Sequence, residues 1–183
     1  MRRALRTRQL RVLLAALLTL APLAAHGQPA AGKDFLALLT GGWDMRGNLR
    51  GRSAHYHAAG RWVLDGAWLE FAMRDVATPP AYAARLFIGY DDGEHDFIAH
   101  WLDRFGAAGA RVVATGTLTG HTLVLSFPYP AGTFRDTLTL VGDSAGTLLI
   151  ESQQPDGSWS TFARYELQRL GKARTRAGPA RSE

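Results

Sequence analysis

The sequence predicts an all-β protein, an antiparallel up-and-down β-barrel of about ten strands with one short helix before it. The clearest observation is the stretch 81–103, in which two runs of aromatic and branched apolar residues flank Asp92-Gly93. This pair favours the tight turn of a β-hairpin, because both turn residues adopt positive φ. The rest of the chain repeats the plan, with strand-like runs separated by Gly, Asp or Pro. Closure removes unpaired edges, so a barrel is favoured over the alternative of an open sandwich.

The first 27 residues have the pattern of a secretory signal peptide. Five arginines precede an apolar run of 14 residues, 12–25, and small residues follow at Ala25-His26-Gly27. The run is too short to span a bilayer, so we expect cleavage near Gly27 and no stable membrane anchor; an uncleaved N-terminal anchor is the alternative. The mature protein is then expected in the bacterial periplasm or outside the cell. With no cysteine in the chain, it folds without a disulfide.

The positive charge of the chain is concentrated at its two ends. The net charge is +5, but residues 33–170 hold 12 Lys and Arg against 15 Asp and Glu. A slightly acidic body has no electrostatic footprint for a polyanion, so no nucleic-acid partner is expected. Residues 171–183 are a basic, polar tail that we expect to be disordered. The folded unit is therefore one domain over residues 28–170.

The domain is expected to begin with a helix of one or two turns. Asp34 is placed as its N-cap, apolar residues follow at helical spacing up to Leu39, and Thr40-Gly41-Gly42 ends it. One Phe and three Leu on so short a helix must be buried. Plugging one end of a barrel would bury them.

Strand candidates follow, each with alternating or aromatic-rich residues and a turn signal at its end. The first three are 43–52, 54–65 and 67–76, with turn signals at Asp65-Gly66 and at Thr78-Pro79-Pro80. The central hairpin supplies the next two, around 86–90 and 97–102. The last five are 111–119, 121–127, 133–141, 147–153 and 159–170. Within 133–141, Phe134, Leu138 and Leu140 share one face, and Arg135, Thr137 and Thr139 share the other.

Three motifs in order resemble a known group of exported bacterial proteins. They are Gly42-Trp43, the run 63–70 (Val-Leu-Asp-Gly-Ala-Trp-Leu-Glu), and Ile88-Gly89-Tyr90-Asp91 leading to Trp101-Leu102-Asp103. Together they resemble the DUF1579-type families of lipocalin-like barrels in the calycin superfamily, over residues 35–170. The resemblance implies a ten-stranded calycin barrel in which Trp43 packs across the closed end. Those families are largely without an assigned activity, so the resemblance implies a fold more than a function.

Metal and haem sites have few candidate ligands. His55 and His57 lie two residues apart on a strand, so both rings share a face and could ligate Zn²⁺ with His95, His100 or His121. No fixed spacing links the pair to a third ligand, and ordinary strand histidines are the simpler interpretation. Nitrobindin-like barrels resemble this fold and bind haem through a late histidine, yet no histidine follows His121. We therefore expect no metal and no cofactor.

Catalytic signatures are not found in the sequence. It has no Gly-x-Ser-x-Gly nucleophile elbow, and its serines fall on strands or turns without a neighbouring base. The acidic cluster Asp91, Asp92, Glu94 and Asp96 is explained by the hairpin turn. The favoured interpretation is a non-enzymatic binding protein.

Five tryptophans in one small domain suggest a ligand cavity as well as core packing. We expect the lumen to hold a small apolar or amphipathic molecule. The candidate lining residues are Trp43, Trp68, Arg85, Tyr90, Phe97, His100, Trp101 and Trp159. Two alternatives stay open: a small enzyme, such as an isomerase or hydrolase of a hydrophobic substrate in the same cavity, and a filled barrel acting through its surface.

Overall fold

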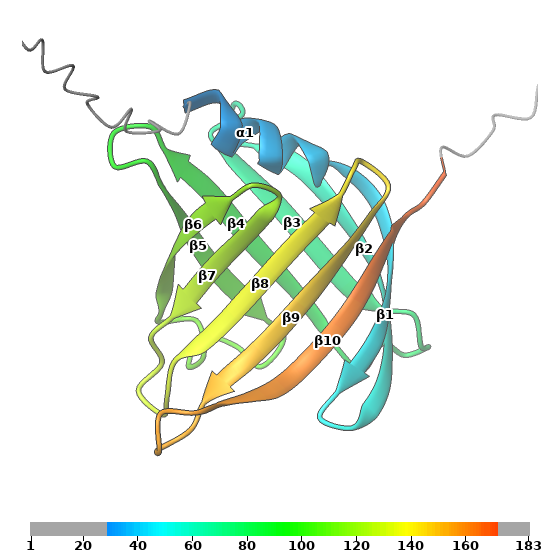
Figure 1. Cartoon of the computed structure of the whole chain (residues 1–183). Helices are drawn as coiled ribbons and strands as arrows, with labels where there is room; N and C mark the ends of the chain where they lie inside the picture. The colour runs from blue at the N-terminus through cyan, green and yellow to red at the C-terminus, as the bar shows by residue number, and fades with distance from the viewer. Residues whose placement is uncertain (1–28, 172–183) are drawn as a thin grey trace, which may run out of the picture.

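The computed structural model describes residues 29–171 as one helix followed by ten antiparallel strands (Figure 1). The elements are α1 (Pro29–Leu38), β1 (Gly41–Leu49), β2 (Arg52–Val63), β3 (Trp68–Asp75), β4 (Ala83–Asp91), β5 (Asp96–Asp103), β6 (Val113–Thr119), β7 (Thr122–Phe127), β8 (Phe134–Val141), β9 (Ala145–Gln153) and β10 (Trp159–Arg169). The predicted signal peptide lies outside the described residues, as does the predicted tail from residue 172 onwards. No helix in the described part is long and apolar enough to cross a membrane.

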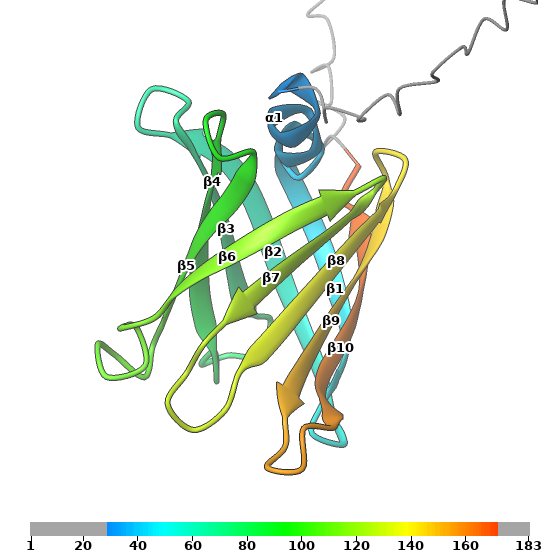
Figure 2. The ribbon, with the colours of Figure 1, turned by 60° about the vertical axis from the view of Figure 1, so that its left-hand side comes forward.

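The strands form one closed barrel in which each pairs with its neighbours in the chain. Closure comes from β1, which pairs with β2 on one side and with β10 on the other (Figure 2). Trp43 lies opposite Arg169 and Leu49 opposite Ala163, so the seam joins the two ends of the domain. The predicted all-β barrel of about ten strands is confirmed, and with it the choice of closure over a sandwich.

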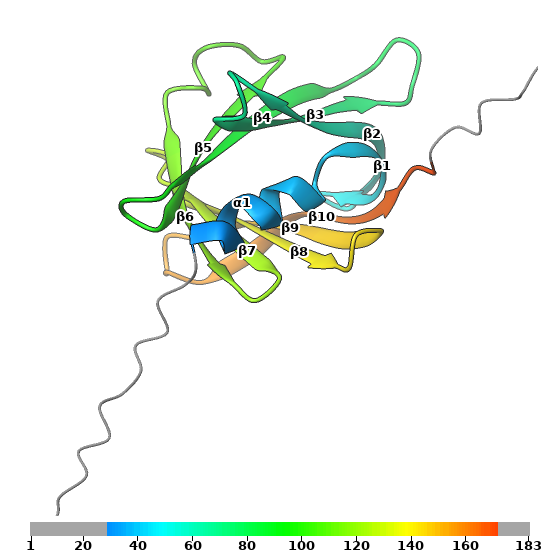
Figure 3. The same ribbon diagram turned by 90° about the horizontal axis from the view of Figure 1, so that it is seen from above.

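Helix α1 lies across one end of the barrel (Figure 3). Its Phe35 and Leu36, together with Leu39 just beyond it, are buried in the core. The Trp43 indole donates a hydrogen bond of 2.9 Å to the Leu39 carbonyl, and the Arg169 guanidinium lies 4.3 Å from the centre of the Trp43 ring. This end is therefore closed, with Trp43 placed as the resemblance implies.

Two local predictions were wrong in detail. Helix α1 begins at Pro29, so Asp34 lies inside it and is not its N-cap; proline suits a first turn because its missing N–H needs no partner there. The hairpin at Asp92-Gly93 exists, but its turn spans 92–95 and the positive φ falls on His95. The Asp91 carboxylate accepts the Gly93 and Glu94 amides at 2.8 and 3.2 Å, which stabilises the longer turn.

Glycine is needed where the barrel closes most tightly. A Cβ at Gly47 on β1 would lie 1.9 Å from the Arg164 carbonyl oxygen on β10. A Cβ at Gly60 on β2 would lie 2.1 Å from the Leu39 carbonyl oxygen beneath α1. In both cases the obstacle is backbone, which cannot move aside as a side chain can. Gly47 therefore lets β1 and β10 approach closely at the seam, and Gly60 lets β2 approach the backbone that follows α1.

Candidate functional site: an aromatic cavity at the open end of the barrel

The end of the barrel away from α1 holds a cavity of about 770 Å³. The β1–β2 connection lies at the end opposite α1 (Figure 2), and residues of this connection and of the neighbouring strand ends line the cavity. Nine aromatic side chains line it: Tyr56, Tyr82, Trp101, Phe105, Phe127, Tyr129, Phe134, Phe162 and Tyr165. Barrels of eight to ten strands are wide enough for one small ligand, and the described part of this barrel leaves such a space at the end away from α1.

The rings of the cavity contact one another along its wall. The Phe127 ring stacks on Tyr129 with centroids 6.1 Å apart, and Trp101 meets Phe127 edge-on at 6.4 Å. Across the cavity, Tyr56 meets Tyr165 edge-on at 5.5 Å. Edge-to-face and offset pairs of this kind hold aromatic side chains in place, so the wall is largely pre-formed.

A short chain of hydrogen bonds orients one side of the wall. The Trp101 indole donates to the Tyr82 hydroxyl at 3.1 Å, and that hydroxyl donates to the Asp103 carboxylate at 3.4 Å. Burial raises the pKa of the Tyr82 and Tyr165 hydroxyls well above the ordinary tyrosine value. These phenols therefore stay neutral and remain available as hydrogen-bonding groups near neutral pH.

The polar group deepest in the cavity is the Asp136 carboxyl. Asp136 lies in the middle of β8, opposite Leu125 on β7 and Ile150 on β9, and is only 4 % exposed. Burial is the one cause of the shift in its pKa, with no hydrogen bond or charge partner contributing within residues 29–171. It also borders a small void beneath the main cavity, so it lies at the floor. Burial raises the pKa of this carboxyl from 3.8 to about 7.

The two other carboxylates of the cavity lie at its rim and have partners. Asp75 accepts the amides of Ala77 and Ala81 at 3.0 and 3.2 Å. Asp103 accepts the Phe105 amide at 2.9 Å as well as the Tyr82 hydroxyl. Arg50 lies in the β1–β2 connection and Arg52 is the first residue of β2, and both are exposed. Asp136 is thus the one charged side chain on the described cavity wall that is both buried and unpaired.

Of the eight residues predicted to line a lumen site, Trp101 lines this cavity. Trp43 and Phe97 are buried in the packed closed half, and Tyr90 is half-buried there, with its ring 4.9 Å from that of Phe97. These three face inward but lie away from the cavity. Their expected place in a lumen wall is corrected, because the core fills that half of the barrel.

Four other predicted residues point outward from the barrel. They are Trp68, Arg85, His100 and Trp159. Trp68 covers Gly89, the ring of His100 bonds the Ala110 carbonyl at 2.7 Å, and Trp159 packs on Arg135. Arg85 pairs with the Glu70 carboxylate, which explains a charged residue on a central strand. Their predicted lumen placement is corrected by strand alternation: inward residues flank Arg85 and His100, and Trp68 and Trp159 begin their strands on the outward-facing side.

Most of the cavity wall was missed by sequence reasoning, although one signal was present. Asp136 shares a face with Phe134 and Leu138, which is visible from the period of two along 133–141. The aromatic residues gather at the strand ends and connections opposite α1. Predicting this cluster from the sequence would require knowing which end of the barrel the helix covers.

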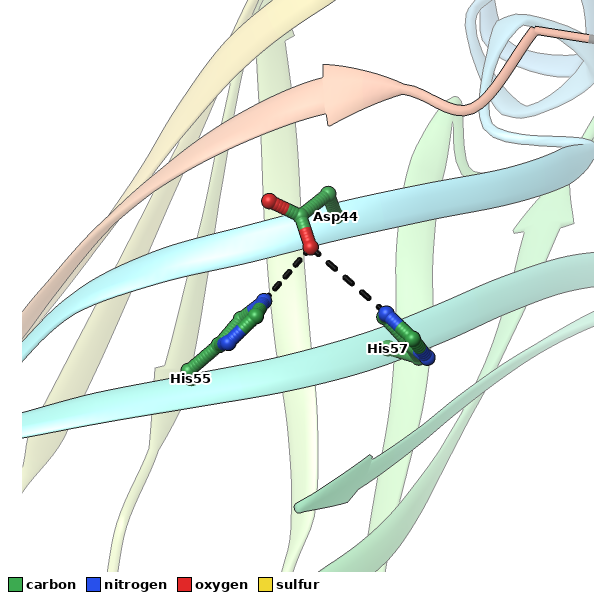
Figure 4. A group of neighbouring side chains, drawn as sticks. All are labelled: Asp44, His55 and His57. Atoms are coloured by element: carbon green, nitrogen blue, oxygen red, sulfur yellow. Dashed lines mark hydrogen bonds and ion pairs between the residues drawn. The ribbon is translucent and has the colours of Figure 1, made fainter. Parts of the chain in front are cut away.

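A second group of polar side chains, the outer-wall cluster, lies outside the barrel (Figure 4). It consists of Asp44 on β1 and His55 and His57 on β2. One Asp44 oxygen lies 2.6 Å from His55 Nε2 and 3.7 Å from His57 Nε2. The His55 hydrogen bond, followed by that of Arg46, lowers the pKa of Asp44. The structure thus brings to the histidine pair a carboxylate that sequence reasoning missed, in place of the suggested third histidines.

The outer-wall cluster could hold a metal ion only after rearrangement. Two ligands of a tetrahedral Zn²⁺ with bonds of about 2.0–2.1 Å lie roughly 3.3 Å apart, further than the 2.6 Å between Asp44 and His55. The second Asp44 oxygen already accepts a hydrogen bond from Arg46 at 2.6 Å. The His57 side chain is 63 % exposed. The arrangement matches a hydrogen-bonded surface ion pair more closely than a metal centre.

Comparison with known proteins gives a family match. A family model described as "Protein of unknown function (DUF1579)" matches residues 28–169. No curated protein matches the sequence. The match covers the helix and all ten strands, so it includes every residue of the cavity.

Proposed function

This chain belongs to the DUF1579 family of proteins of unknown function, and we propose that its barrel binds a small apolar or amphipathic molecule in the cavity at its open end. The observation that carries the proposal is the cavity itself, about 770 Å³ with nine aromatic rings on its wall. Ligand pockets commonly have about 300–1,000 Å³ and combine apolar walls with a few polar groups. Tyr82, Tyr129 and Asp136 supply such groups here.

The cavity supports the proposal over the alternative of a filled barrel that works through its surface. A filled lumen would resemble the closed half, where Trp43, Phe97 and their neighbours leave no space of comparable size. The aromatic walls of an open cavity are in contact with water, and an apolar ligand would remove that apolar surface from water.

The test is binding to a cavity that can be blocked. Ala54 lines the cavity, whereas Ala59 is exposed on the outer face of the same strand. The wild type should change its tryptophan fluorescence on titration with long-chain acyl and aromatic probes, and native mass spectrometry should detect molecules that co-purify with it. Ala54→Phe should weaken binding, and the matched Ala59→Phe should not. Equal binding by all three proteins, or no binding by any, would refute the proposal.

A small enzyme using the same cavity remains the second candidate, and Asp136 is the observation that favours it. A buried carboxyl with a pKa near 7 is suited to proton transfer at neutral pH. Turnover of a bound apolar substrate that disappears in Asp136→Asn, while binding persists, would favour an isomerase over a carrier.

Export is proposed on the strength of the N-terminal pattern described above. The mature chain is then expected to start near Gln28 and to be found in the periplasm or the medium. N-terminal sequencing of protein from cell fractions tests this, and an intact Met1 on membrane-bound protein would contradict it.

A further inference from the structure

We infer that the molecule bound in the cavity is an amine, whose protonated amino group pairs with the Asp136 carboxylate while its apolar body packs on the aromatic rings. The inference rests on the proposed function and specifies its ligand class. It is carried by the position of Asp136, which is buried at the floor of the cavity and has no partner within the described residues.

The buried Asp136 carboxyl lacks a partner that its ionised form would require. Buried charges in proteins are nearly always paired, because moving a carboxylate out of water without a partner is costly. Neighbours of Asp136 on the adjoining strands are Leu125 and Ile150, which offer no hydrogen bond from their side chains. A ligand cation reaching the floor would supply the missing partner. Glu70, the other buried acid, needs none, because Arg61 and Arg85 lie at its carboxylate.

The wall of the cavity favours a positively charged ligand over a negatively charged one. The faces of Tyr, Trp and Phe rings carry negative electrostatic potential and attract cations. No Lys or Arg lines the deep part of the described cavity, since Arg50 in the β1–β2 connection and Arg52 at the start of β2 are both exposed at the rim. The Arg50 guanidinium already lies over the Phe162 ring, 5.5 Å from its centre. A carboxylate ligand would therefore meet Asp136 without a compensating cation, whereas an ammonium group meets both the carboxylate and the ring faces.

Several other titratable side chains belong to the residues that line the cavity around Asp136. Tyr129 and Tyr165 are close enough to interact with it, and burial raises the pKa of both, so they stay neutral between pH 5.5 and 8. The remaining titratable side chains of the cavity-lining residues are those of Tyr56, Tyr82, Asp75, Asp103, His55, Arg50 and Arg52. His55 points to the outer face and bonds Asp44. Asp136 is thus the titratable group at the floor.

The experiment compares three probes with the same hydrocarbon chain and different head groups: n-decylamine, 1-decanol and decanoate. Binding to the mature protein is measured by isothermal titration calorimetry at pH 8, below the concentration at which each probe aggregates. We expect decylamine to bind at least about tenfold more tightly than decanol, since a hydrogen bond to a charged group is stronger than one between neutral groups. Decanoate should bind most weakly.

Substitution of Asp136 tests whether that preference comes from the floor. In Asp136→Asn the advantage of decylamine over decanol should disappear, while decanol binding stays within about twofold of the wild type. Asp143→Asn, in the exposed turn between β8 and β9, removes the same charge away from the cavity and should leave all three affinities unchanged.

A measurement on the wild type alone keeps the inference testable if Asp136→Asn does not fold. Pairing with an ammonium group requires the carboxyl to lose its proton, so decylamine affinity should rise from pH 5.5 to 8 by at least about sevenfold and at most about thirtyfold if the pKa of Asp136 is about 7. Decanol affinity should stay flat. Equal binding of amine and alcohol, or tighter binding of decanoate, would overturn the amine while leaving the cavity as a binding site. No binding of any probe would overturn the proposed function as well.

Discussion

Replacing Asp136 with Asn should change how the stability of the fold depends on pH. Burial raises the pKa of the Asp136 carboxyl from 3.8 to about 7, so between these values the folded protein holds a proton that the unfolded chain has released. The free energy of unfolding therefore falls as pH rises through this window, by about 1.4 kcal/mol per pH unit. Between pH 5 and 8 this amounts to roughly 3 kcal/mol, while the neutral Asn side chain contributes no such dependence.

The assay is urea unfolding followed by tryptophan fluorescence at pH 5, 6, 7 and 8, for the wild type, Asp136→Asn and the control Asp143→Asn. Contributions from all other titrating groups are common to the proteins and cancel in the difference between them. The stability of Asp136→Asn relative to the wild type should rise by roughly 3 kcal/mol from pH 5 to 8, with most of the change below pH 7. A difference that stays constant across this range would show that the carboxyl is solvated or paired, and the reasoning would be wrong.

The remaining predictions concern packing, the cavity wall and metal. Trp43→Ala should lower the free energy of unfolding by about 3–5 kcal/mol, measured by urea unfolding, because it empties a packed site under α1. Trp101→Ala should cost less and weaken probe binding more, since its ring faces the cavity; equal destabilisation without loss of binding would contradict this. Gly47→Ala should lower the melting temperature, because its Cβ would meet the Arg164 carbonyl, whereas Gly109→Ala, with open space around it, should not. Purified protein should contain less than one equivalent of zinc and keep its melting temperature in chelator; a stoichiometric metal lost when both histidines of the outer-wall cluster become alanine would refute this.

Much of the fold could be predicted because strand and turn signals are local. Asp65-Gly66, Thr78-Pro79-Pro80 and Gly120 each mark an interruption that backbone geometry imposes on a strand, and the strands end at or near them. The start of α1 was missed because a plausible cap at Asp34 competes with Pro29, and docking of the helix on the barrel end decides between them.

The site was harder to predict than the fold. Alternation shows which residues share a face, so Trp68 and Glu70 could be separated from Leu69 and Phe71 by sequence alone. It does not show which face is inside when both carry aromatic residues, and for this reason Trp68 and Trp159 were placed in the lumen. The contact between Asp44 and the two histidines depends on the register of β1 against β2, which strand periodicity does not specify.

The sequence by itself determined the all-β class, the approximate number and order of the strands and the presence of a helix at one end, because these follow from periodicity, turn chemistry and apolar composition within short stretches. Only the tertiary structure decided which half of the barrel is packed and which is open. That division follows from the pairing of β1 with β10 across the length of the domain and from the docking of α1 over Trp43. Core side chains fill the barrel beneath the helix, and the remaining space lies among the aromatic residues around Asp136 because no second helix or strand of residues 29–171 covers that end.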